Sequence, residues 1–342
     1  MSEYEDLEYD LQLTPEFQSE EQLQTLKRWC RTNVSQDIVF TGSASEKYHQ
    51  YHELAKAFLD YFKPRVPGNI EQLVDDFEQQ TAIQYAATKG YDRFIHSLKM
   101  LTPMVFDQPN QNSMTPLHLA ALKGHVHTVD ALLKQGANPK ITNKNKQTPL
   151  FSALQLSIRD KNDKKMHSKK EHVFHLLWSN APDSVMHQDT SGDSVFHLMA
   201  SNGFADLLSQ TLEKAPEGIA LRNNHTRFPI HTAILNNQLS VAKHLLEHAS
   251  DIANDQTDSQ GRAPLHYAAM YGSDDLVELC ISATKDINKR DTLDQTPLIL
   301  AAAAHNQTAA VHILIHHGAD ESLTDCNNRT YHDYEINNKY SY

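Results

Sequence analysis

The sequence predicts an all-α solenoid in which short helix–turn–helix repeats stack side by side. One indication is a seven-residue pattern, T-P-L-H-L-A-A from Thr115, whose variants recur about every 34 residues. Another is an apolar content of 39%, below the roughly 45–50% usual for a compact domain, which favours an elongated architecture with a large surface. A third is a pair of apolar clusters in each repeat, spaced as on amphipathic helices.

Copies of the pattern begin at residues 81, 115, 148, 194, 228, 263, 296 and 330, with steps of 34, 33, 46, 34, 35, 33 and 34. Pro at the second position suits the first turn of a helix, and a Thr or Ser before it can act as the N-cap. Leu and Ala then place small apolar residues along one helix face. A second cluster follows, for example Val129, Leu132 and Leu133, so each repeat is expected to hold two helices.

The T-P-L-H tetrad and the period of about 33 residues resemble the ankyrin repeat family. The resemblance runs from about residue 70 to the end and implies an ankyrin repeat domain over residues 70–342. It also implies that polar stretches such as Gly136 to Gln147 form β-hairpin fingers. In this family the fourth tetrad residue is structural, which is the interpretation we prefer for four histidines over a row of metal ligands: His118, His197, His231 and His266.

The turn between the two helices of a repeat is expected to need a positive φ, which Gly adopts freely and Asn or His tolerates. The residues nine positions after the start of a copy fit this requirement: Gly90, Gly124, Gly203, Asn237, Gly272 and His305.

The third repeat lacks the turn glycine and has Ser157 in its place. Residues 157–170 are therefore predicted to form an inserted loop that projects from the stack. The loop is basic, with six Lys or Arg side chains against two Asp. The last copy has no room for a second helix and is expected to be a C-terminal cap.

The N-terminal part of the chain falls outside the repeats. Residues 1–19 are predicted to form an acidic, flexible arm, because residues 1–26 hold eight acidic side chains and no basic one. Residues 20–69 are predicted to form a helical N-terminal unit that covers the apolar end of the first repeat.

Composition excludes several classes of function. A net charge of −12 argues against nucleic acid as a partner, because phosphate-backbone affinity comes from clustered Lys and Arg. Three cysteines are too few for a disulfide framework and suit a reducing compartment. No apolar stretch approaches the ~18–20 residues of a membrane span. We therefore expect a cytoplasmic monomer with no cofactor and no membrane span.

Two weaker interpretations concern chemistry. The pairs His244/His248 and His312/His316 have a spacing that could hold a metal ion, but no third ligand is evident, so we expect no metal site. Cys30 could act as a nucleophile with His49 or His52 in an enzyme whose repeats recruit the substrate. No catalytic motif surrounds it, so this enzyme is the alternative function and we assign no catalytic residue.

The preferred function is binding of a protein partner, with an acidic segment, through the concave face that ankyrin repeats present. Irregular copies and an unfamiliar N-terminal part also resemble, in style, effectors that intracellular bacterial pathogens deliver into the cytosol or nucleus of a host cell. The predicted partner-binding residues lie in the fingers and after the tetrads: Lys123, Lys144, Lys146, Arg222, His225, Arg227, Asp258, Arg262, Met270 and Tyr271.

Overall fold

The computed structural model describes residues 82–90, 92, 95, 106–157, 163–248, 256–304 and 308–339. The expected acidic arm (1–19) and helical N-terminal unit (20–69) lie outside these residues. The chain divides into two compact units. Unit 1 comprises residues up to 153 together with 163–184, and unit 2 comprises 154–162 and the chain from 185 onward.

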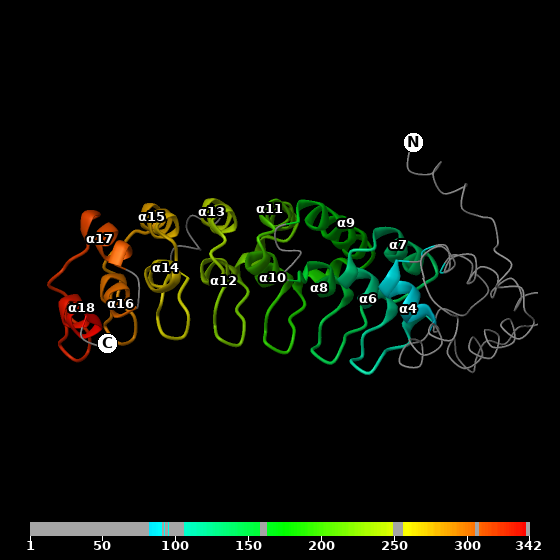
Figure 1. Cartoon of the computed structure of the whole chain (residues 1–342), viewed down its shortest axis with the longest axis horizontal. Coiled ribbons are helices and arrows are strands. Elements are labelled where there is room, and N and C mark those ends of the chain that lie inside the picture. The colour runs from blue at the N-terminus through cyan, green and yellow to red at the C-terminus, as the bar shows by residue number, and fades with distance from the viewer. Residues whose placement is uncertain are drawn as a thin grey trace, which may run out of the picture. The chain divides into compact units, whose positions relative to one another are not determined.

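The helices alternate between the first and the second helix of successive repeats (Figure 1). The first helices are α4 (Ala82–Lys89), α6 (Pro116–Lys123), α8 (Pro149–Leu154), α10 (Val195–Asn202), α12 (Pro229–Leu235), α14 (Pro264–Tyr271), α16 (Pro297–Ala303) and α18 (Tyr331–Lys339). The second helices are α7 (Val126–Lys134), α9 (Lys164–Asn180), α11 (Ala205–Lys214), α13 (Leu239–His248), α15 (Asp274–Ala283) and α17 (Thr308–His316). Two 3-10 turns, η4 (Pro182–Met186) and η5 (Pro216–Ala220), follow α9 and α11.

Unit 2 is a two-layered stack. Helices α10, α12, α14, α16 and α18 each contact the next and form one layer, while α11, α13, α15 and α17 form the other. In unit 1, α4 packs on α6 and α7 on α9 in the same manner. The all-α class is confirmed: the described residues contain no strand, and their one isolated β-bridge joins Gln188 to Ser194.

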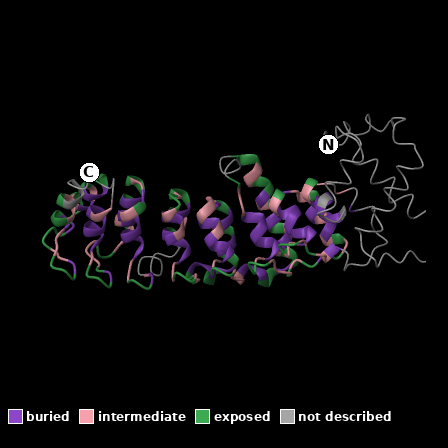
Figure 2. Cartoon of the chain, turned by 60° about the horizontal axis from the view of Figure 1, so that its bottom comes forward, coloured by how far each residue is buried: buried purple, intermediate pink, exposed green. Residues whose placement is uncertain are grey.

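First helices begin as the tetrad predicts. In α6, Pro116 occupies the first turn, and the N–H of Thr115 donates to Nδ1 of His118 over 3.1 Å. The alanines that follow, Ala120 and Ala121, are fully buried, so neighbouring helices approach closely. Figure 2 shows the result, with first helices mainly buried and fingers mainly exposed or half-buried.

Two of the four tetrad histidines join one repeat to the next, whereas Nε2 of His231 and Nε2 of His266 are buried without a hydrogen-bond partner among the described residues. Because Nδ1 of His118 accepts a hydrogen bond, its Nε2 carries the proton and donates to the carbonyl of Gln147 over 2.9 Å. His197 makes the equivalent bond to the carbonyl of Arg227 over 2.9 Å. Burial lowers the pKa of His118 and of His266 to about 4, so both rings are neutral at pH 7. The structural interpretation of these histidines is confirmed.

Each described finger is a tight hairpin closed by one side chain and by backbone hydrogen bonds of the same residue. An Asn or Asp five residues before the tetrad accepts hydrogen bonds from the backbone N–H groups two and four residues further on. The residue three positions after it has a positive φ of 58–74°. The closing residues are Asn110, Asn143, Asp189, Asn223, Asp258, Asp291 and Asp325.

Adjacent fingers within a unit are joined through the backbone, for example by the N–H of Thr292 donating to the carbonyl of Gln260 over 2.8 Å. The fingers therefore fold back as expected, but a closing side chain and single cross-links replace a β-ladder.

The turns between helices depart from prediction at one position. Gly90, Gly124, Gly203 and Asn237 have φ values of 83°, 70°, 82° and 54°, as expected. Gly272 instead has a φ of −79°. Glycine is required there by contact, because a Cβ atom would lie 2.8 Å from the carbonyl oxygen of Ala268. His305 lies outside the described residues.

The inserted segment 157–170 also differs from expectation. Helix α9 begins at Lys164, because Asp163 caps it by accepting from the N–H groups of Lys165 and Met166. The second half of the expected loop is thus a helical extension. Moreover, Lys170 is only 1% exposed and cannot contribute to a basic surface.

The Lys170 ammonium group satisfies the C-terminal ends of two first helices. It donates to the carbonyls of Ala121 and Leu122 in α6 over 3.1 and 2.5 Å, and to that of Ser152 in α8 over 3.2 Å. Carbonyls in the last turn of a helix have no partner further along it, and a cation is favourable beside them.

Lys170→Met is expected to lower the free energy of unfolding by about 2–4 kcal/mol, because three buried carbonyls lose their charged donor. Urea denaturation followed by circular dichroism measures the change. Lys165→Met, on the exposed side of the same helix, is the matched control and should alter stability by less than ~0.5 kcal/mol. Equal stability of the two variants would contradict the role of Lys170.

The buried histidines predict loss of stability in acid. The pKa of His266 is about 4 in the fold against an ordinary 6.5, so its contribution is complete above pH 6.5 and is lost as the pH falls toward 4. His266→Gln keeps an acceptor for the N–H of Ala263 and should reduce the pH dependence of the unfolding free energy by about 1.4 kcal/mol per pH unit.

Urea denaturation between pH 4.5 and 6.5 measures this slope. The same replacement at the exposed His225 is the control and should retain the slope of the native chain. An unchanged slope in His266→Gln would contradict a neutral buried imidazole.

Candidate functional site

The candidate site in unit 2 is built on the solvent-facing side of α14. Tyr267, Met270 and Tyr271 have the spacing that places three side chains on one helix face. Tyr267 is buried, Met270 is half-buried and Tyr271 is 52% exposed, with the two tyrosine rings 6.4 Å apart. The positions equivalent to Tyr271 on other first helices of unit 2 carry small or polar side chains: Asn202, Asn236 and Ala304.

Tyr267 is held in place by the fingers on either side of it. Its hydroxyl donates to Oδ2 of Asp258 over 2.7 Å and accepts from Nε of Arg227 over 3.2 Å. The guanidinium carbon of Arg227 also lies 5.7 Å from the ring centroid of Tyr267. Burial, followed by the bond to Asp258, raises the pKa of Tyr267. The ring that supports Tyr271 is therefore fixed at its polar end.

Asp258 is a structural residue of its finger and is only 8% exposed. Burial opposes its charge, but hydrogen bonds from Tyr267 and from the N–H groups of Arg262 and Gln260 outweigh that effect and lower the pKa of Asp258. Arg262 is engaged in turn, since its Nε donates to Oδ2 of the buried Asp291 over 3.2 Å. The side chains of Asp258 and Arg262 therefore order the surface, and most of their polar atoms are engaged within the fold rather than available to a partner.

Arg222 and His225 belong to the finger before α12 and are both exposed. The guanidinium carbon of Arg222 lies 4.6 Å from the ring centroid of the buried Phe228. A cation over an aromatic face gains electrostatic attraction while its outer N–H groups stay available. Of the predicted residues in unit 2, Arg222, His225, Met270 and Tyr271 thus reach the surface, and we call these four the α14 surface.

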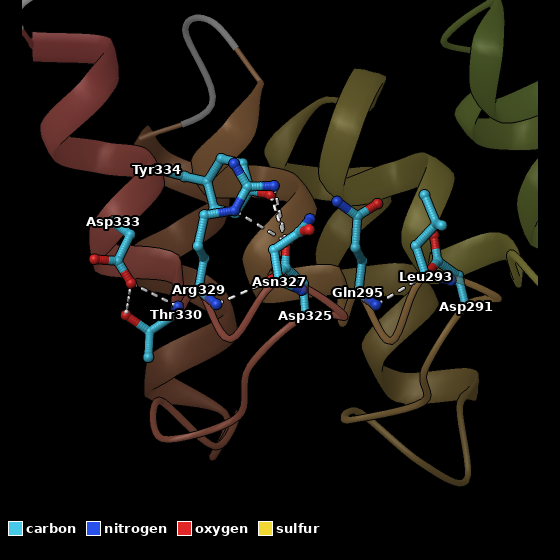
Figure 3. Close-up of polar contacts among 9 residues, drawn as sticks. All are labelled: Asp291, Leu293, Gln295, Asp325, Asn327, Arg329, Thr330, Asp333 and Tyr334. Carbon is cyan, nitrogen blue, oxygen red and sulfur yellow. Dashed lines mark hydrogen bonds and ion pairs between the residues drawn. The ribbon is translucent and has the colours of Figure 1, made fainter.

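The last finger repeats the tyrosine–aspartate contact, which sequence reasoning missed. The Tyr334 hydroxyl donates to Oδ2 of Asp325 over 2.6 Å, and Nη2 of Arg329 donates to the same oxygen over 3.1 Å (Figure 3). Burial opposes the charge of Asp325, but these bonds and the backbone N–H groups hold its pKa well below the usual range. Asp or Asn five residues before a tetrad, with Tyr directly after the tetrad, is the signal that would have identified both contacts.

Three predicted residues lie in unit 1. Lys123 ends α6, and Lys144 and Lys146 lie in the finger closed by Asn143. All three side chains are exposed, and the backbone of Lys146 occupies the left-handed region with φ 58°. The structure places these lysines at the ends of one first helix and one finger.

The described residues hold no group of three or more His, Cys, Asp or Glu side chains arranged for a metal ion. Cys280 is a core residue, and burial raises the pKa of its thiol to about 12. Cys326 is exposed in the last finger. Cys30, His49 and His52 lie outside the described residues.

Comparison with known proteins identifies the repeats. The family model of ankyrin repeats in three copies matches residues 83–161, 165–256 and 252–325. The human ASB11 ankyrin repeat domain shares the fold, with a TM-score of 0.55 and 20% identity over 70% of this chain and 99% of that one.

Several curated proteins are similar in sequence. Ankyrin repeat and KH domain-containing protein mask-1 of Caenorhabditis elegans is 28% identical over 81% of this chain and 10% of its own length. Human transient receptor potential cation channel subfamily A member 1 is 24% identical over 71% of this chain and 27% of its own length. The mouse B-cell lymphoma 3 protein homolog is 25% identical over 69% of this chain and 53% of its own length. The chain therefore spans between a tenth and about half of these relatives.

Within the part of the chain that the structure describes, no helix combines the length and the apolar character needed to cross a membrane. Since the family model matches well over half of its residues, this chain belongs to the ankyrin repeat family.

Proposed function

We propose that this ankyrin repeat protein binds a protein partner through the α14 surface, with Tyr271 as the main apolar anchor. The observation that carries the proposal is the half-exposed ring of Tyr271, supported by Tyr267, whose hydroxyl is fixed by Arg227 and Asp258. A large exposed ring on a rigid support loses little conformational entropy when it is covered, and Tyr, Met and Arg are enriched at interface centres.

The fingers add the polar part of this surface. Arg222 is exposed beside the buried ring of Phe228 and His225 is exposed in the same finger, whereas Arg227 and Arg262 are already bonded within the fold. An exposed arginine that is already partly ordered suits recognition of a carboxylate. We propose that the partner contributes an acidic segment. We also propose that the protein binds it as a monomer in the cytoplasm.

Replacing the anchor should weaken binding without unfolding the protein. A Met270→Ser/Tyr271→Ser variant is expected to bind the partner about 10–100-fold more weakly, because hot-spot truncation typically costs about 2 kcal/mol or more. Affinity capture from eukaryotic lysate with mass spectrometry would identify the partner, and titration calorimetry would measure the dissociation constant.

Leu239→Ser is the matched control, because Leu239 is an exposed apolar residue on the second-helix layer of the same unit. It should retain the partner and its affinity. Melting curves must show both variants folded. A partner that binds both variants with the native dissociation constant would contradict the α14 surface as the site.

The basic residues of unit 1 predict electrostatic steering of an acidic partner. Lys123→Gln/Lys144→Gln should lower the association rate constant several-fold and reduce its dependence on salt, while the dissociation rate changes less. Stopped-flow or surface-plasmon measurements between 50 and 300 mM salt test this. Lys243→Gln on α13 removes a comparable exposed charge from a second helix of unit 2 and is the control. The same rate constant in every variant would rule out steering.

The remaining functional hypotheses stay predictions. Catalysis by Cys30, with the repeats recruiting substrate, concerns residues that the structure does not describe. Its test is the rate at which Cys30 reacts with a mild alkylating reagent near pH 7, compared with a free cysteine. The hypothesis that the protein is a bacterial effector delivered into a host cell is based only on a general similarity of the sequence to such effectors. The identity of the captured partner would test it.

A further inference from the structure

Helix α9 is longer than the other second helices, and its additional turns lie at its N-terminal end. It has 17 residues, whereas the other second helices of the described chain have nine or ten. Because Asp163 caps the helix early, these turns bring three exposed lysines onto one side of it: Lys164, Lys165 and Lys169. Among the described residues, no carboxylate forms an ion pair with any of the three.

A fourth exposed lysine, Lys123 at the end of α6, lies close to this part of α9. The two helices pack tightly at Gly124, where a Cβ atom would lie 3.2 Å from Sδ of Met166 and 3.7 Å from Cβ of Lys169. Lys123 directly precedes this glycine and is exposed. Two successive repeats therefore present ammonium groups to the same region of unit 1.

The ring of His125 reports the positive potential of this region. Burial is the largest cause of the lowered pKa of His125, and the charges of Lys169, Lys123 and Lys170 lower it further. Like charges at close range repel one another, so an anionic group bound here would relieve that repulsion. We name the four exposed lysines the α9 basic face: Lys123, Lys164, Lys165 and Lys169.

Charge is divided unevenly along this chain. The described residues of unit 1 contain ten Lys or Arg against six Asp or Glu, whereas those of unit 2 contain ten against eighteen. Residues 1–26 contain eight acidic side chains and no basic one, and five of the eight lie in the segment from Glu3 to Asp10. An acidic segment of this chain therefore gains favourable electrostatic energy beside unit 1 and loses it beside unit 2.

We propose that residues 1–26 dock on the α9 basic face of their own chain. The two have opposite charge, and carboxylates of Asp and Glu accept charge-assisted hydrogen bonds from Lys ammonium groups. They are also close along the chain, because the described repeats begin at α4, α4 packs on α6, and α6 contacts α9. Residues 27–81 connect the acidic segment to α4, which is far more chain than the roughly 20 Å across two helix-to-helix spacings requires.

A tethered segment has an advantage over a free acidic partner at this face. Its effective concentration at a neighbouring site is on the order of millimolar, so ion pairs that are individually weak hold it in place together. Docking would cover Lys123, one of the lysines expected to steer an acidic partner, and the two would compete there. The contact itself does not rest on the proposed function, because the α9 basic face lies in unit 1 and the α14 surface in unit 2.

Carbodiimide cross-linking of the full chain, followed by peptide mapping with mass spectrometry, tests the contact. The reagent activates a carboxylate, and a lysine amine within ion-pair distance displaces the resulting urea, so one amide bond forms and the carbodiimide takes up the water. Links should join carboxylates of residues 1–26 to lysines of the α9 basic face, in a product with the mass of one chain. Their yield should fall several-fold between about 50 and 500 mM salt, because exposed ion pairs are screened.

Reversing the charges on each side separately, and then on both, shows whether the two sides interact. Lys165→Glu/Lys169→Glu should lower the yield of links to Lys123 at least tenfold, and Glu5→Lys/Glu8→Lys should lower it several-fold, because each introduces like-charge repulsion. The variant with all four substitutions should recover the links, because opposite charges face each other again. Recovery cannot arise from unfolding, so the combined variant keeps the test valid if another loses stability.

Lys144→Glu/Lys146→Glu is the matched control, since it makes the same change of charge in a finger of unit 1. Fingers and second helices lie on opposite sides of the first helices, so this variant should keep the native yield (Figure 1). Absence of links to the α9 basic face at low salt, or an equal yield of links to Lys144, would overturn the proposal. Links found only in a product of twice the mass would assign the face to a second copy of the chain, which also overturns it, as does failure of the combined variant to recover the links.

Discussion

The buried tetrad histidine, which accepts the first N–H of its own helix, is the feature on which helix initiation in four of the repeats depends, and in two of them it also bonds to the following finger. His118 to Gln147 and His197 to Arg227 each tie the start of one first helix to the backbone that leads into the next. Nδ1 must be occupied by the helix N-cap for Nε2 to carry the proton, so helix initiation and repeat stacking are coupled through a single ring.

The fingers are ordered by a second device that serves the exposed surface. A single Asx side chain, together with short backbone hydrogen bonds, closes each finger in place of the ladder of a β-hairpin. Where Tyr follows the tetrad, as at Tyr267 and Tyr334, the second carboxylate oxygen also anchors the helix to its own finger. Tyr267 therefore gives the exposed ring of Tyr271 in the α14 surface a fixed support.

Sequence reasoning predicted the repeats, their boundaries and the burial of the tetrad, because these follow from local patterns that recur at a fixed period. It was less successful for side chains whose contacts are made with other repeats or other fingers. Asp258, Arg227 and Arg262 were expected to face a partner, yet their side chains bond within the fold, a pairing that appears only when successive fingers are in register. Gly272 was assigned to a positive φ, whereas its close approach to Ala268 explains the glycine. The prediction of a loop up to Lys170 did not consider that Asp163 can cap a helix. It also did not consider that carbonyls at the ends of α6 and α8 can accept hydrogen bonds from Lys170.

The buried ammonium group of Lys170 has a consequence for how unit 1 unfolds. Repeat arrays behave approximately as one-dimensional chains, in which each repeat has its own stability and a coupling to its neighbour. Lys170 belongs to the third repeat, yet it completes a helix end in the second as well as in its own. Opening either repeat exposes an uncompensated charge or unpaired carbonyls in the other, so these two repeats form a single cooperative segment despite the twelve or so extra residues within the third repeat.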